Sequence, residues 1–319
     1  MESLKLWLND VFRLTIRLKK HRMLMRIICI KESMMKKLYI ILSLLLVLSG
    51  CQNKVDDTKL QVVTSFYPIY DLTQTITNNR LNVRNIAPLS LEVHDFEPTP
   101  QDIASLETAS LLVVHGNHLE GWLESTLEAI NNKDLKVLIL SDYVTLLDDD
   151  NHSWLSIDNM IEYSMQISQS LSEIDPDGAA SYEANQLTWA QEASELMTEF
   201  SYLYDNQQQY ELVVDHMAYS YLVKDLNMTQ RSITGGQLAS DLSAKALKDI
   251  IDHIKANETQ VIYKDEESSP NLFTMLNSET GVEVETLYTL EVMSIEDYKP
   301  YLEMMRMNLE AIGKVVLND

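Results

Sequence analysis

Cysteine is nearly absent from this sequence. The 319 residues include two cysteines, Cys29 and Cys51, and both lie in the N-terminal region. The rest of the chain therefore has no thiol, which excludes a disulfide framework and a thiolate metal site there. Any metal bound by the folded part must be held by imidazole and carboxylate groups.

Basic residues are also scarce after the first 50 positions. The formal net charge is −23, and residues 1–50 hold ten Lys and Arg against three Asp and Glu. The remainder then holds 15 basic and 45 acidic residues. Such a surface repels phosphate backbones, so we expect no nucleic-acid partner. The acidity suits a cation ligand, but most acidic proteins are merely soluble.

The N-terminal region has the pattern of an export signal. Lys36 and Lys37, which follow Met34 and Met35, precede an almost wholly apolar run, 38–48, which is short for a membrane span. Together with the small residues that follow, this predicts a secretory signal peptide at 34–50. Residues 1–33 are interpreted as a start assigned too far upstream, with Met34 or Met35 as the natural beginning.

The sequence Leu-Ser-Gly-Cys at residues 48–51 resembles the lipobox of bacterial lipoproteins. The resemblance implies cleavage before Cys51, lipidation of its sulfur and a polar tether at 51–59. The alternative is a plain signal peptide in which Cys51 is incidental.

Apolar β-rich runs alternate with helical patterns from residue 60 to the C-terminus. The alternation predicts an α/β fold with two doubly wound parallel-sheet lobes, at 60–178 and 210–319. Residues 179–212 lack Gly and Pro and carry apolar residues at helical spacing. A helix of about 25 residues would span roughly 37 Å. We expect segment 179–209 to be a rigid connecting helix, although an ordinary long core helix fits the same pattern.

Four potential metal ligands lie at or near the ends of predicted strands: His94, His152, His216 and Glu291. Ligands of doubly wound sheets bind at the carboxyl ends of the strands. We therefore expect these side chains to meet in the cleft between the lobes and to hold one zinc ion. For Glu291 the competing residues are Asp265, Glu266 and Glu267.

Several nearby residues have weaker claims. Asp95, Glu97 and Asp215 are candidates for orienting the imidazoles, and the acidic run 148–150 is interpreted as a solvated loop rather than a cation-attracting lip. Three other histidines are interpreted as surface residues: His115 and His118, for which an accessory site is the alternative, and the solvent-facing His253.

The chain resembles the zinc and manganese solute-binding lipoproteins of bacterial ABC transporters (cluster A-I) over nearly all of residues 60–316. Five segments carry the resemblance in the family's order: residues 63–68 (Val-Thr-Ser-Phe-Tyr-Pro), 94–98 (His-Asp-Phe-Glu-Pro), 152–155 (His-Ser-Trp-Leu), 216–219 (His-Met-Ala-Tyr) and 290–291 (Leu-Glu). Two features depart from the family: Ser-Ile replaces the Asp-Pro that often follows the third segment, and an acidic loop replaces the His-rich loop of many zinc members.

The resemblance implies a monomeric zinc receptor, without enzyme activity, that delivers Zn²⁺ to an ABC permease. It would be anchored through Cys51 to the outer face of a bacterial membrane of the Gram-positive type. Three imidazoles and one carboxylate suit tetrahedral zinc, whereas manganese prefers more oxygen. Manganese members have an acid at the position of His216.

Three alternatives stay open: a manganese receptor of the same family, a secreted zinc hydrolase, and an adhesin without an essential metal. The hydrolase needs an open coordination position, and neither a His-Glu-x-x-His motif nor a nucleophile elbow is present. The adhesin would leave the ligand matches unexplained.

Overall fold

The structure is a computed structural model that describes residues 59–147, 150–205, 210–233, 243–266, 268–294, 296 and 298–317. The predicted signal peptide, Cys51 and nearly all of the tether lie outside these residues, as do Asp148, Asp149 and Glu267. Within the described part of the chain, no helix has the length and apolar character needed to cross a membrane.

The first lobe is built on a four-stranded parallel sheet with the order β2-β1-β3-β4. Its strands are β1 (Gln61–Thr64), β2 (Asn82–Asn85), β3 (Leu111–Val114) and β4 (Lys136–Ile139). Its helices are α2 (Tyr67–Thr77), α3 (Pro100–Leu106), α4 (Leu123–Ala129) and α5 (Ile157–Ile174). Short 3₁₀ turns η1 (Val93–Asp95), η2 (Leu140–Tyr143) and η3 (Ser153–Leu155) follow the strand ends.

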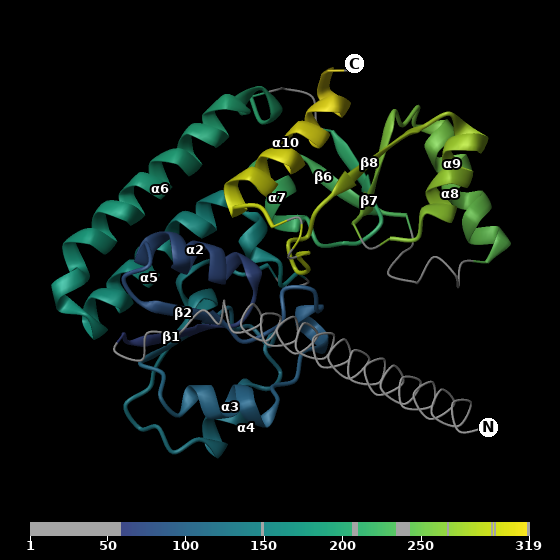
Figure 1. The fold of residues 1–319 in the computed structure, drawn as a ribbon. Helices are drawn as coiled ribbons and strands as arrows, with labels where there is room; N and C mark the ends of the chain where they lie inside the picture. The colour runs from purple at the N-terminus through teal and green to yellow at the C-terminus, as the bar shows by residue number, and fades with distance from the viewer. Residues whose placement is uncertain are drawn as a thin grey trace, which may run out of the picture. The chain divides into compact units, whose positions relative to one another are not determined.

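The second lobe repeats this topology, with the strand order β6-β5-β7-β8 and parallel pairing throughout. Its strands are β5 (Glu211–Val214), β6 (Thr229–Ser232), β7 (Val261–Asp265) and β8 (Glu283–Leu287). Its helices are α7 (Ser220–Asp225), α8 (Ala244–Ala256), α9 (Pro270–Thr280) and α10 (Tyr301–Leu317). The predicted α/β class with two parallel-sheet lobes is confirmed (Figure 1).

The helix between the lobes, α6 (Ala179–Glu199), has 21 residues and is shorter than the sequence indicated. It packs against α2 and α5 of the first lobe and also against α10 (Figure 1). After the helix the chain continues into a 3₁₀ segment, η5 (Ser201–Leu203), and Phe200 and Leu203 are both buried.

Local chemistry explains where several helices begin. The Thr99 hydroxyl accepts a hydrogen bond from the backbone N–H of Asp102, and the Asp102 carboxylate accepts one from the N–H of Thr99, which makes a capping box. The Ser156 hydroxyl accepts a hydrogen bond from the backbone N–H of Asn159 at the start of α5, and Pro270 opens α9. The sequence predicts these three helix starts, because Thr99 and Ser156 are natural N-cap residues and proline suits the first helical position.

One hydrophobic core joins the two lobes. It contains residues of both sheets, such as Val62 and Val214, together with buried residues of α2, α5, α6 and α10. Two smaller clusters cover the opposite faces of the two sheets. The shared core fixes the lobes against each other, so loops that follow strands of different lobes can meet.

Candidate metal centre

Three of the four predicted ligands meet at one point. Glu291 Oε1 lies 3.0 Å from His94 Nε2 and 3.0 Å from His152 Nε2. One potential ligand atom from each residue lies within 4.8 Å of the other two. The Glu291 side chain is 2% exposed, whereas that of His94 is 40% exposed. The group therefore has a buried base and a side that is open to solvent.

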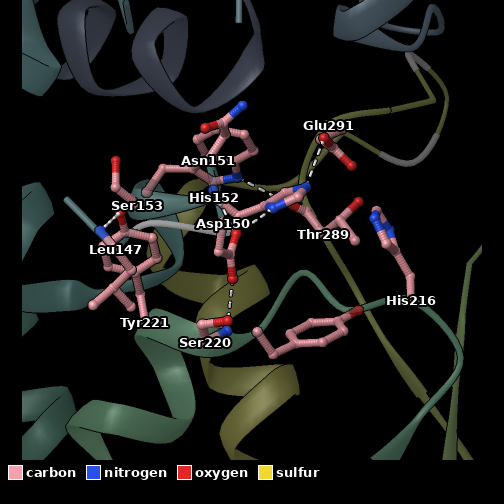
Figure 2. Close-up of polar contacts among 12 residues, drawn as sticks. Leu147, Asp150, Asn151, His152, Ser153, His216, Ser220, Tyr221, Thr289 and Glu291 are labelled. Atoms are coloured by element: carbon pink, nitrogen blue, oxygen red, sulfur yellow. Dashed lines mark hydrogen bonds and ion pairs between the residues drawn. The ribbon is translucent and has the colours of Figure 1, made fainter. Parts of the chain in front are cut away.

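A carboxylate contacts the ring nitrogen of His152 that does not face Glu291. Its ring Nδ1 lies 2.6 Å from Asp150 Oδ1, and its backbone N–H donates to the same oxygen at 2.8 Å (Figure 2). A carboxylate can only accept, so Nδ1 carries the proton and Nε2 faces Glu291. The next residues form η3, whose Trp154 is fully buried and anchors the turn.

The loop that carries Glu291 follows β8 but is fastened to the first lobe. Trp154 Nε1–H donates to the carbonyl of Thr289 at 2.8 Å, and Met293 N–H donates to the carbonyl of Leu89 at 2.6 Å. Leu290 adopts φ of +63° and is fully buried, which is unusual for a residue with a branched side chain. The loop thus has a constrained backbone conformation just before Glu291.

His216 lies beside this group and is not part of it. Its ring centroid is 5.2 Å from that of His152, and its Nδ1 lies 3.4 Å from Asp265 Oδ2. Its side chain is 45% exposed. The ligand role of His216 stays a prediction.

Charges within the cluster shift the pKa values of its members. Burial lowers the pKa of His152, but the carboxylates of Asp150 and Glu291 outweigh burial and raise it to about 9. The contact with Glu291 also raises the pKa of His94. Burial alone would raise the pKa of Glu291, yet the two imidazoles hold it well below its usual range. The cluster therefore favours an ionised carboxylate with cationic partners, whether protons or a metal ion supply the positive charge.

Sequence reasoning missed the carboxylates that hold the imidazoles. Asp150 was interpreted as part of a solvated run, but it is 4% exposed and bonded to His152. Asp265 was considered as a ligand and instead contacts His216. The predicted alternatives Asp95 and Glu97 are exposed. An acid two positions before a candidate His was the available signal for Asp150.

Two other histidine interpretations were wrong. His115 is fully buried, with Nε2 2.6 Å from Ser153 Oγ, and burial lowers its pKa to about 4. It therefore holds η3 through Ser153 and is not a surface residue. His253 is half-buried and lies 3.3 Å from Glu211 Oε2, whereas His118 is exposed as expected.

Two parallel-sheet lobes with imidazole and carboxylate groups gathered at their strand ends form the architecture of a two-lobe solute-binding protein. The chain belongs to the ZnuA family, described as "Zinc-uptake complex component A periplasmic", whose profile matches residues 62–315. This is a family of solute-binding proteins and not of enzymes.

Two curated relatives and one solved structure place the chain within this family. It is 28% identical over 303 residues to the zinc-binding lipoprotein AdcA of Streptococcus pneumoniae R6, covering 87% of this chain but 60% of AdcA. It is 28% identical over 309 residues to the high-affinity zinc uptake system protein ZnuA of Bacillus subtilis 168, covering 88% and 97%. The Zn(II)-bound ZnuA-like domain of S. pneumoniae AdcA superposes with a TM-score of 0.73 at 28% identity, covering 81% of this chain and 98% of that domain.

Proposed function

We propose that this chain is an extracytoplasmic zinc receptor that captures Zn²⁺ and delivers it to an ABC permease. The observation that carries the proposal is the position of Glu291 Oε1, which lies 3.0 Å from an imidazole nitrogen of both His94 and His152. Zinc is the cargo of this site. The names of AdcA and ZnuA support the same function.

The donor set fits zinc. Zinc binds imidazole nitrogen and carboxylate oxygen at about 2.0–2.2 Å, and two ligands on a tetrahedron then lie about 3.3 Å apart. The observed 3.0 Å separations are close to that value. Although His152 Nε2 and Glu291 Oε1 are this close, neither buried atom makes a hydrogen bond of ordinary geometry within the described part of the chain. A shared cation would satisfy both atoms.

His216 is the proposed fourth ligand. Its Nδ1 faces Asp265, as the Nδ1 of His152 faces Asp150, so both rings leave Nε2 available for metal. Three nitrogen donors and one oxygen donor favour zinc over manganese, and the Irving–Williams order points the same way.

A complete set of four protein ligands leaves no coordination position for a catalytic water, which supports a receptor rather than an enzyme. We further propose that the chain acts as a monomer and is held at the outer face of the membrane by a lipid on Cys51. The domain boundaries 60–178, 179–209 and 210–319 belong to the same proposal.

Titration calorimetry with Zn²⁺ and Mn²⁺ tests this function. We expect one zinc per chain, tighter binding of zinc than of manganese, and weaker zinc binding in His216→Ala. His253→Ala is the matched control, because His253 lies on α8 beside Glu211 and should leave zinc affinity unchanged. Equal affinity for the two metals, or an unchanged affinity in His216→Ala, would contradict the assignment.

A further inference from the structure

Asp150 contacts both lobes with one carboxylate. Its Oδ1 is bonded to the backbone N–H and the ring Nδ1 of His152. Its Oδ2 accepts a hydrogen bond from the backbone N–H of Ser220 at 2.9 Å (Figure 2). Ser220 is the first residue of α7 in the second lobe and lies four positions after His216. The Asp150 side chain therefore contacts both His152 and α7, the helix that follows His216 in the chain.

A second hydrogen bond joins the same two segments. The backbone N–H of Leu147 donates to the hydroxyl of Tyr221, which follows Ser220 in α7, at 2.8 Å (Figure 2). Leu147 and Asp150 form an isolated β-bridge, so the two contact points lie side by side. The Tyr221 contact does not involve His152, which allows the link between the lobes to be tested apart from the ligand.

We propose that Asp150 is a positioning residue that links the orientation of His152 to the contact between the lobes. This inference depends on the proposed zinc-receptor function. When the start of α7 is bound to Oδ2, the carboxylate is fixed, and Oδ1 then holds His152 with Nε2 toward Glu291. Zinc binding and lobe contact therefore strengthen each other.

The chemistry requires a carboxylate because both sides of Asp150 face donors. An Asn of the same shape has one oxygen and one NH₂ group. If its oxygen faces His152, its NH₂ meets the Ser220 N–H and the lobe contact is lost. If its NH₂ faces His152, ring Nδ1 must accept, the proton moves to Nε2, and that atom is blocked for zinc. Two donors of His152, its backbone N–H and its ring, face Oδ1, whereas one donor, the Ser220 N–H, faces Oδ2. We therefore expect the first orientation in Asp150→Asn, in which the contact with α7 is lost and the side chain that holds His152 is no longer fixed.

The test measures zinc affinity, cobalt coordination and lobe separation in one set of variants. Spin labels on Glu128→Cys in α4 and Glu279→Cys in α9, both exposed positions, report the distance between the lobes. The full chain carries Cys29→Ser and Cys51→Ser, because these are its two native cysteines. Zinc affinity is measured by chelator competition, and Co²⁺ absorption reports the ligand set.

We expect Asp150→Asn to weaken zinc binding about 10–100-fold. Its Co²⁺ spectrum should change and its lobe distances should stay broad at saturating zinc. Tyr221→Phe should weaken zinc binding about 2–10-fold, because it removes one hydrogen bond between the lobes, and its Co²⁺ spectrum should match the wild type. Tyr143→Phe, at an exposed position in η2, is the control and should change nothing.

Wild-type zinc affinity in Tyr221→Phe, or wild-type lobe distances in zinc-saturated Asp150→Asn, would overturn the link while leaving the receptor function intact. A wild-type chain that binds no zinc would contradict the receptor function itself, and the link with it. Tyr221→Phe lies away from the ligands, so it decides the question even if Asp150→Asn does not fold.

Discussion

Zinc and protons compete for the same imidazole nitrogens, so zinc binding by this chain should depend steeply on pH. The carboxylates of Asp150 and Glu291 raise the pKa of His152 to about 9 despite its burial. At pH 7, about 99% of His152 is then protonated in the metal-free protein. Removing that proton costs about 2.7 kcal/mol, which corresponds to about 100-fold in zinc affinity.

Zinc affinity should increase with pH, because the pKa of His152 is raised. A raised pKa means that zinc must displace a proton below pH 9, so affinity should increase about tenfold per pH unit between pH 7 and 9 and level off above that. His94, whose pKa is also raised by Glu291, adds a second proton as the pH falls. Acid should therefore release zinc more steeply than a single histidine would.

Calorimetry at pH 7 in several buffers of different ionisation enthalpy counts the released protons. We expect between one and two protons per zinc ion. Glu291→Gln should reduce the number, because it removes the carboxylate that faces both imidazoles. Release of less than half a proton, or a zinc affinity that does not change between pH 6 and 8, would refute the electrostatic reasoning.

Two further predictions concern the same cluster, and a third concerns a hydrogen bond of Trp154. In chelator-treated protein, protonation of His152 stabilises the fold because its pKa is raised to about 9. This stabilisation is fully present below pH 6.5 and is lost as the pH rises through 9. Thermal unfolding should therefore show a loss on the order of 3 kcal/mol in the free energy of unfolding, and the zinc-loaded protein should not show it. Glu291→Gln should weaken zinc binding at least about 100-fold in chelator competition, whereas the exposed Glu279→Gln should not. Tyr301→Phe removes a 2.7 Å hydrogen bond to the buried carbonyl of Trp154 and should cost about 1–3 kcal/mol in chemical denaturation; no loss would mean that this contact is dispensable.

The two lobes could be predicted because buried parallel strands are short apolar runs separated by helical patterns. The helix starts at Thr99 and Pro270 depend on equally local features, an N-cap residue and a proline at the first helical position. The end of α6 was not predicted: no Gly or Pro marks it in the sequence, and Phe200 and Leu203 just after it lie in a core formed with distant segments. Local patterns predict where a helix begins better than where tertiary packing ends it.

Part of the candidate site could also be predicted from the sequence, and part could not. Strand ends pointed to His94, His152 and Glu291, since parallel strands bring their carboxyl ends to one edge of each sheet. The burial of Asp150 was missed, because it follows two more aspartates in a run that resembles a solvated loop, and its position two residues before His152 was the one local signal. Its burial depends on donors from His152 and from Ser220, which lies 70 positions away.

Trp154 fixes the relative positions of two candidate ligands, His152 and Glu291, that are distant in sequence. Its indole N–H binds the carbonyl of Thr289, two residues before Glu291, while its own backbone lies two residues after His152. Its carbonyl accepts the hydroxyl of Tyr301, at the start of α10. A fully buried indole thus sets the spacing between the imidazole and the carboxylate. Substituting Trp154 should therefore disturb zinc binding through geometry, although this residue supplies no ligand atom.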